Sequence, residues 1–324
     1  MTWAREISAI VERRCVSCHV KDGYAGFSLA AYEDARPWAV AIKEEVLAGD
    51  MPPWGAAPGV GHFANDRRPT RHEQELIAAW VDGGAPYSLE APRPNPQAPT
   101  PIISPHEQPA GAVVLPLAPA DITEATQRTA SVTLQLPAGM HLISWAFEPG
   151  TPALVQSVEL ELDARWLGTW TPGDARVEFP PDAAAPLTTN AMFSARVAYR
   201  APAARTRDFS RLWIWMAREA RLKTVREATV VRSWRATAAV EVFALRPSGD
   251  AGDADVVAYF ANGRAEPLGF LVTPDHAAHP TYRLARPLPL PSGARVETTS
   301  PIKLLYSTGA TRTVKPNVRR RPRR

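Results

Sequence analysis

The pattern of hydrophobic and polar positions divides the chain into a helical part and a β part. Apolar side chains recur at helical spacing over residues 3–14 and over residues 34–48, which predicts two helices. A third helix is predicted after Thr70, which can form a capping box with Glu73, and it ends at Asp82-Gly83-Gly84. Three helices within about 85 residues predict a small all-α unit.

The hydrophobic period changes from helical to alternating after residue 119. Short alternating runs divided by Pro and Gly are typical of strands in β-sandwiches or barrels. The predicted strands cover residues 131–136, 141–147, 153–162, 192–199, 211–216, 228–234, 238–245, 254–260, 268–272 and 302–307. We expect two β-sandwiches that divide near residue 220.

Proline separates the helical part from the β part. The chain has 33 prolines among 324 residues, and they crowd between residues 86 and 119. A proline-rich stretch of this kind forms an extended, semi-rigid linker. The predicted organisation is an all-α domain over 1–87, a linker over 88–120, β-sandwiches over 121–220 and 221–311, and a basic tail over 312–324.

The formal net charge of +4 comes from the C-terminal tail. Residues 312–324 hold six arginines and one lysine, so the rest of the chain carries a charge of −3. Nucleic-acid binding needs a basic face on a folded module, and we therefore expect no nucleic-acid partner. A basic tail is typical of a segment that contacts acidic lipid or an acidic protein. No apolar run reaches the ~18 residues that a membrane-spanning helix needs.

The run Cys15-Val16-Ser17-Cys18-His19 has the spacing of a c-type haem attachment motif. Two cysteines three positions apart on a helical turn can each form a thioether with one vinyl group of the same porphyrin. The histidine that follows then ligates the iron from one side of the ring. The motif predicts one covalent haem c as the cofactor.

Two other interpretations of the cysteine pair are weaker. A zinc site needs a second pair of ligands, and the chain has only these two cysteines. A thioredoxin-like dithiol needs a βαβ setting, which the predicted helices do not provide. A chance match is the remaining alternative.

Met51 is the leading candidate for the second axial ligand of the iron. It follows directly after the helix predicted over 34–48, and Pro52 and Pro53 hold the chain extended beside it. A histidine–methionine pair suits an electron-transfer haem. A core methionine is the alternative interpretation, and His62 and His72 are rival ligands. Trp54 is expected to cover a haem edge.

Further runs accompany the haem motif: Phe27-Ser28-Leu29, Tyr32-Glu33-Asp34-Ala35-Arg36-Pro37-Trp38, Met51-Pro52-Pro53-Trp54, Phe63-Ala64-Asn65-Asp66-Arg67, Trp80-Val81-Asp82 and Gly84-Ala85-Pro86. With the motif, they resemble the cytochrome c module that some bacteria fuse to a copper type II, ascorbate-dependent monooxygenase-like region. The resemblance covers almost all of residues 4–87. It implies that Cys15 and Cys18 hold the haem, that His19 and Met51 are the axial ligands, and that the β part is a tandem jelly-roll.

The β part departs from that family in its metal ligands. The resemblance implies two copper ions held by five histidines and a methionine, whereas only His141, His276 and His279 follow the linker here. We therefore expect the β part to bind no copper and to catalyse no reaction. The run Asp275-His276-Ala277-Ala278-His279 could hold a metal, but its flanking prolines favour a solvated turn.

These observations predict an exported c-type monohaem cytochrome that transfers electrons, with the β part as a docking or structural body. The partner is expected to be a redox protein or a membrane electron-transfer complex. Two alternatives stay open: a copper- and haem-dependent monooxygenase, and a structural subunit of a membrane complex. Thioether attachment takes place outside the cytoplasmic membrane, so we predict a periplasmic protein. Because Met1 leads directly into a helix, an export signal is expected upstream of it.

Overall fold

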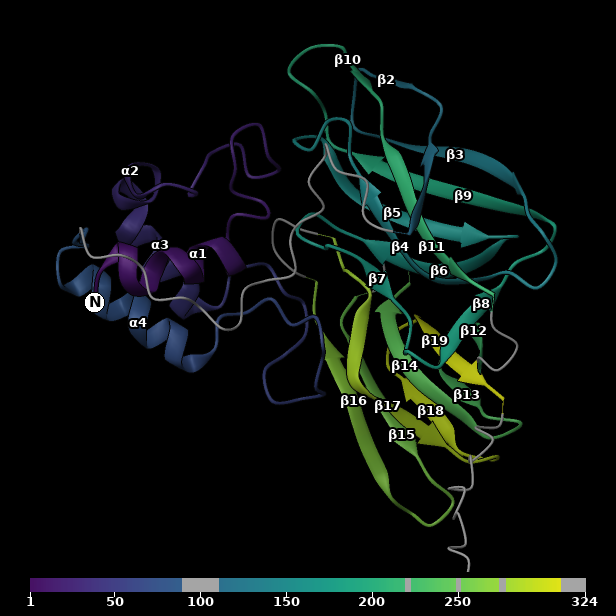
Figure 1. The fold of residues 1–324 in the computed structure, drawn as a ribbon. Helices are drawn as coiled ribbons and strands as arrows, with labels where there is room; N and C mark the ends of the chain where they lie inside the picture. Colours follow the sequence, from purple (N-terminus) through teal and green to yellow (C-terminus); the bar gives the residue numbers. More distant parts are fainter. Residues whose placement is uncertain (89–110, 219–222, 249–251, 274–277, 310–324) are drawn as a thin grey trace, which may run out of the picture.

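A computed structural model describes residues 1–88, 111–218, 223–248, 252–273 and 278–309 of the chain. Short helices precede a large all-β region, and Figure 1 shows the helices lying beside the sheets. The order predicted from the sequence, helices first and then a β-rich region, is confirmed. Within the described residues, no helix is long and apolar enough to cross a membrane.

The helical region follows the predicted periods with one interruption. The first helix begins with a π-helical turn, η1 (Trp3–Ile7), and continues as α1 (Ser8–Arg14). The helix predicted over 34–48 consists of α2 (Tyr32–Ala35), a 3₁₀ turn η2 (Arg36–Trp38) and α3 (Ala39–Ala48). Pro37 lies in η2 and has no N–H to donate, which explains the break.

The last helix of this region is α4 (Arg71–Asp82), and its capping box is confirmed. The backbone N–H of Glu73 donates to Thr70 Oγ1 over 3.2 Å, and the N–H of Thr70 donates to Glu73 Oε2 over 2.6 Å. Trp80 of α4 is fully buried, and its ring centroid lies 5.8 Å from that of Trp3. The region therefore has its own core, in which α4 packs against the first helix and α3.

The largest sheet of the β region has nine strands. Its order is β1 (Ala112–Pro116), β11 (Arg211–Ala217), β4 (His141–Glu148), β8 (Ala183–Pro186), β12 (Lys223–Val230), β19 (Ile302–Thr308), β14 (Val240–Pro247) and β17 (Tyr282–Leu290), with β7 (Val177–Glu178) paired to β4.

Smaller sheets face the two halves of this large sheet. One contains β3 (Thr126–Gln135), β9 (Asn190–Tyr199), β5 (Val155–Leu162) and β6 (Arg165–Trp170). Another contains β13 (Ser233–Arg235), β18 (Arg295–Thr298), β15 (Ala254–Tyr259) and β16 (Ala265–Leu271). A further pair joins β2 (Ala120–Ile122) to β10 (Thr206–Asp208).

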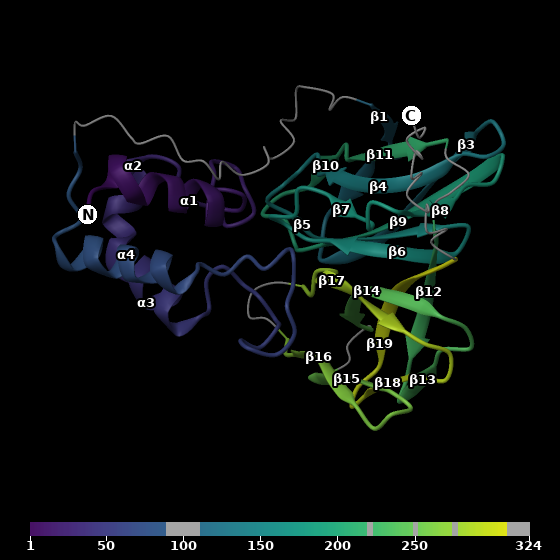
Figure 2. The ribbon, with the colours of Figure 1, turned by 60° about the horizontal axis from the view of Figure 1, so that its bottom comes forward.

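Two apolar cores lie between the sheets, in a sandwich-like arrangement. The first is built mainly from β4, β5, β6, β9 and β11, and we call this part the first β body. The second is built mainly from β14 to β19, and we call this part the second β body. Figure 2 shows the two bodies stacked end to end, with the helices beside their junction.

The boundary between the β bodies differs from the expected one. Strand β8 precedes residue 220 and pairs in parallel with β12, which follows it, so one sheet continues through both bodies. The first core also takes in Val225, Phe243 and Leu305. The range 88–120 differs at its end as well, because β1 pairs with β11 along its whole length; residues 89–110 of the predicted linker and the tail lie outside the described residues.

Most of the predicted strands are present, with two informative differences. The strand predicted over 228–234 is in fact the end of β12 and the separate β13, which belong to different sheets. Strand β17 was not predicted, because Pro287 and Pro289 interrupt its pattern. It lies at an edge of the nine-stranded sheet, which is where strands tolerate proline.

The segment after α3 joins the helical region to the second β body. Ala57 N donates to Phe270 O of β16 over 2.8 Å, and Ala285 N of β17 donates to His62 O over 2.8 Å. The side chain of Trp54 is 7% exposed and its ring lies 4.9 Å from that of Tyr282. Residues of the helical region therefore extend both sheets of the second β body at their edges.

Candidate functional site

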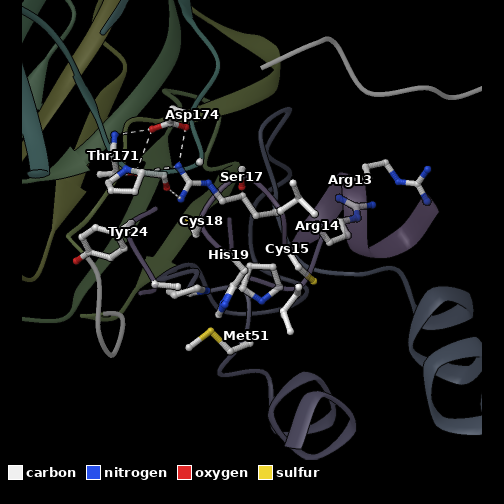
Figure 3. Close-up of a pocket in the computed structure, with 18 of the residues that line it drawn as sticks. Arg13, Arg14, Cys15, Ser17, Cys18, His19, Tyr24, Met51, Thr171 and Asp174 are labelled. Atoms are coloured by element: carbon white, nitrogen blue, oxygen red, sulfur yellow. Dashed lines mark hydrogen bonds and ion pairs between the residues drawn. The ribbon is translucent and has the colours of Figure 1, made fainter. Parts of the chain in front are cut away.

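One cleft brings together all four predicted haem-binding residues. Its volume is about 1160 Å³, and Cys15, Cys18, His19 and Met51 line it. Figure 3 shows these residues together, with Thr171 and Asp174 of the β region beside Ser17 and Cys18 and farther from Met51. The cleft therefore has a helical wall and a β wall.

A buried ion cluster holds the end of α1 where the cysteines begin. Glu73 of α4 accepts from Arg13 Nη2 over 2.6 Å and from Arg14 Nη2 over 3.0 Å. Burial alone raises the pKa of this carboxyl, but the N–H of Thr70 and the two guanidinium groups outweigh it and lower the pKa to about 2. Glu73 is therefore ionised at neutral pH, and it ties α4 to the residues just before Cys15.

The haem motif forms a tight turn that continues from α1. The N–H groups of Cys18 and His19 both donate to Cys15 O, over 3.1 Å and 2.9 Å. Neither cysteine forms a disulfide. Burial raises the pKa of the Cys15 thiol to about 12, and it also raises the pKa of Cys18. Both sulfurs are therefore protonated thiols at neutral pH in the chain alone.

His19 presents a neutral imidazole to the cleft. Burial lowers the pKa of its ring, and Nδ1 is a buried atom without a hydrogen-bond partner in the described part of the chain. The ring of Phe27 meets it edge-on at 4.5 Å, and Trp38 stacks on Phe27 at 4.8 Å. A neutral ring held by apolar contacts is in the protonation state that ligates a metal.

The end of α3 positions Met51 at the same cleft. Gly49 adopts a φ of 88°, which ends the helix in the left-handed region that glycine tolerates. The N–H groups of Asp50 and Met51 then both donate to Glu45 O, over 3.0 Å and 3.2 Å. Pro52 and Pro53 continue along the cleft wall.

The competing ligands and Trp54 lie elsewhere. His62 and His72 are both exposed, and neither lines the cleft. Trp54 was expected to cover a haem edge, and this expectation is wrong: its side chain is buried in the core of the second β body. The reason is packing, because the rings of Phe63 and Tyr282 surround it at 6.1 Å and 4.9 Å.

The β wall of the cleft was missed by the sequence analysis. It includes the turn from Thr171 to Asp174, which follows β6. Arg67, from the helical region, reaches this turn and forms an ion pair with Asp174 at 2.7 Å. Arg67 closes the run Phe63-Ala64-Asn65-Asp66-Arg67, and nothing in its sequence neighbourhood marks it as part of the cleft.

The described histidines of the β region, His141 and His279, belong to no metal-binding group. Within the residues that the structure describes, no three His, Cys, Asp or Glu side chains gather in a way that could hold a metal ion. His276 lies outside the described residues. His279 is 8% exposed, so the expected solvated turn is wrong at this position. Burial and the nearby Arg246 lower its pKa to about 4, and its Nδ1 lies 3.0 Å from the hydroxyl of Tyr282.

Comparisons with known proteins add little to this site. No protein-family model matches the chain, and no curated protein matches it. Among solved structures, the major capsid protein P2 of bacteriophage PM2 matches with a TM-score of 0.31 and 12% sequence identity. The match covers 62% of this chain and 99% of the capsid protein. A similarity this weak carries no argument about fold or function.

Proposed function

We propose that the protein is an exported c-type cytochrome that holds one haem covalently and transfers electrons. The observation that carries the proposal is the convergence of Cys15, Cys18, His19 and Met51 on one cleft. These four residues come from two segments separated by more than 30 residues, and a chance match to the motif would not require Met51 to lie beside it.

The donor set of the cleft suits a haem of this type. Cys15 and Cys18 are free thiols on one turn, so both sulfurs are available for thioether bonds. His19 contributes an uncharged imidazole and Met51 a thioether sulfur, which are the axial ligands of electron-transfer haems. When bound, the haem supplies reversible one-electron transfer between ferrous and ferric iron.

The proposal also covers the role of the β region, the partner and the cellular location of the protein. The helical region is proposed as a cytochrome c domain, and the β region as a tandem jelly-roll that acts as a docking or structural body rather than as a catalyst. The proposed partner is a redox protein or a membrane electron-transfer complex. Because thioether attachment takes place outside the cytoplasmic membrane, we assign the protein to the periplasm.

The test of attachment uses a chain produced together with a cytochrome c maturation system. The wild type is expected to retain its haem after extraction with acidic acetone, because thioether bonds survive this treatment. Cys15→Ser combined with Cys18→Ser should release all of it. Ser17→Ala is the matched control, because it changes the same turn and keeps both sulfurs. Extraction of the haem from the wild type would contradict the proposal.

The test of the axial ligand compares Met51 with His62. In the ferric wild type, a weak near-infrared band from sulfur–iron ligation is expected, and Met51→Ala should abolish it. His62→Ala should leave the spectrum unchanged, since His62 is exposed and does not line the cleft. A wild type without this band, together with loss of the low-spin spectrum in His62→Ala, would instead assign the ligand to His62.

A further inference from the structure

The turn over residues 171–174 is locked to the helical region by a single arginine. The side chain of Arg67 is 17% exposed, and its guanidinium donates to Pro172 O over 2.9 Å and to Thr171 Oγ1 over 2.8 Å. The same group pairs with Asp174 Oδ1 at 2.7 Å. Within the described part of the chain, the ionic and hydrogen-bonding partners of this guanidinium all belong to the β region.

Asp174 is fixed from the other side by the turn itself. Its Oδ2 accepts from the N–H of Thr171 over 2.8 Å and from Thr171 Oγ1 over 3.0 Å. Its backbone O accepts from Trp170 Nε1 over 2.7 Å. Trp170 is the last residue of β6 and belongs to the first core. The carboxylate therefore has a position set by a rigid sheet, which is what a precise electrostatic effect requires.

This ion pair lies directly against the haem motif. A Cβ placed on Gly173 would come within 3.2 Å of Ser17 Oγ and 3.4 Å of Arg67 Nη1. Gly173 also has a φ of 95°, which glycine tolerates best, so a larger residue here would be strained and would press on both neighbours. Ser17 lies between the two cysteines, and the charges of Arg67 and Asp174 both act on Cys18, with opposite signs.

A second contact holds the chain just after the motif. Arg200 of the first β body donates to Tyr24 O, and its guanidinium lies 4.6 Å from the centroid of the Tyr24 ring. The β region thus contacts the segment 15–26 near both of its ends, at Ser17 and at Tyr24. The helical wall and the β wall are two parts of one binding site.

We propose that Arg67 and Asp174 are positioning residues, which clamp the haem motif against the β region and set the charge beside Cys18. This inference rests on the proposed function for the role of the charges, whereas the clamp itself is a property of the chain alone. It gives the β region a direct part in the cytochrome: the β region fixes the electrostatic environment of the cofactor.

The two charges have opposite expected effects on the reduction potential. Ferric iron carries one more positive charge than ferrous iron, so a nearby cation favours the reduced state and a nearby anion favours the oxidised state. Arg67→Gln should therefore lower the midpoint potential, and Asp174→Asn should raise it. Arg67→Lys keeps the charge, so its potential should stay close to that of the wild type.

The experiment measures midpoint potentials of the full-length, haem-loaded variants by redox titration. Asp82→Asn is the matched control, because Asp82 pairs with Lys43 in an exposed ion pair outside the cleft. Opposite shifts for Arg67→Gln and Asp174→Asn, with none for Asp82→Asn, would support the proposal. A purely structural role would move both potentials in the same direction or leave both unchanged, and either result would overturn the proposal.

The clamp is tested separately in the haem-free full-length chain by amide hydrogen exchange. Arg67→Gln and Asp174→Asn should each accelerate exchange over residues 15–26 several-fold, while Asp82→Asn should not. Unchanged exchange in this segment would overturn the clamp, whether or not the wild type attaches haem. Accelerated exchange in a chain that attaches no haem would keep the clamp and reject the proposed function, so the two failures are distinguishable.

Discussion

The helical region and the β region each contain a carboxylate that pairs with several cations: the buried Glu73 and the half-buried Glu159. In the helical region, Glu73 holds Arg13 and Arg14 directly before Cys15, at the wall of an open cleft. In the β region, Glu159 of β5 pairs with Arg246 of β14 at 2.7 Å, and this pair joins the two β bodies away from the cleft.

Both clusters stay charged at neutral pH, and they differ in which parts of the molecule they position. Burial raises the pKa of Glu159, but Arg246, Lys303 and Arg196 outweigh it and lower that pKa, so the cluster stays charged. The Glu159 cluster joins strands of the two β bodies, whereas the Glu73 cluster places Arg13 and Arg14 at the wall of the cleft. A buried ion pair adds little net stability compared with apolar packing, but removing one partner costs several kcal/mol. Each cluster therefore fixes the relative position of the elements that it joins: α1 and α4 in one case, β5 and β14 in the other.

The largest expected effect tests whether the helical and β regions form one unit. Trp54→Ala removes a 7% exposed indole from the core of the second β body. We expect the free energy of unfolding to fall by about 3 to 5 kcal/mol, measured by denaturant titration with Trp and Tyr fluorescence. Trp38→Ala is the control, because the side chain of Trp38 is 47% exposed. Equal effects of the two substitutions would contradict the packing of Trp54 described above.

The next effect sharpens the contrast between the ion clusters. Glu73→Gln leaves the half-buried Arg13 and Arg14 without a charged partner, and it should destabilise the helical region by about 3 kcal/mol at neutral pH. The pKa of Glu73 falls from 4.5 to about 2 on folding. Its stabilising contribution is therefore present above pH 4.5 and is lost as the pH falls toward 2.

The measurement is the free energy of unfolding of wild type and variant between pH 7 and pH 2. The difference between them should shrink in the acid range, because the wild-type carboxyl becomes protonated there. Asp82→Asn, which breaks the exposed pair with Lys43, should cost less than about 1 kcal/mol. A Glu73 effect as small as that of Asp82 would show that the cluster is not structurally important.

A smaller, pH-dependent effect is expected in the β region. Burial and Arg246 lower the pKa of His279 from 6.5 to about 4. As the pH falls through 6.5, the unfolded chain therefore binds a proton before the folded chain does. Stability should decline by about 2 to 3 kcal/mol between pH 6.5 and pH 4 and then level off.

His279→Gln should flatten this part of the stability profile, because glutamine does not titrate. The control is His72→Gln, since His72 is exposed on the first turn of α4. A profile that keeps its slope without His279 would assign the pH dependence to other groups.

The sequence predicted the local features of the site well. The helical period before Cys15, the capping box at Thr70 and the end of α3 at Gly49 depend on neighbouring residues, and each is present. Most strands were also predicted, because alternation of apolar and polar side chains is likewise a local pattern. The strand over 228–234 was misplaced because alternation continues across the turn between β12 and β13. A period of two carries no information on when the chain changes sheets.

The tertiary contacts of the site could not be predicted in this way. The partners of Arg67 lie more than 100 residues later in the chain, and no local pattern marks that pairing. Trp54 follows Met51 so closely that a shared role in the cleft was the natural expectation. The intervening prolines direct the chain away, and the indole packs beside Tyr282 instead. Only the fold shows that the β region supplies one wall of the cleft.

The most direct test of the account is the haem and metal content of one purified sample. The chain is produced with a cytochrome c maturation system and supplied with both iron and copper during growth. We expect one covalently bound haem and one iron per chain, and no stoichiometric copper. A chain with tightly bound copper in addition to haem would favour the monooxygenase alternative, and a chain without covalent haem would contradict the account at its centre.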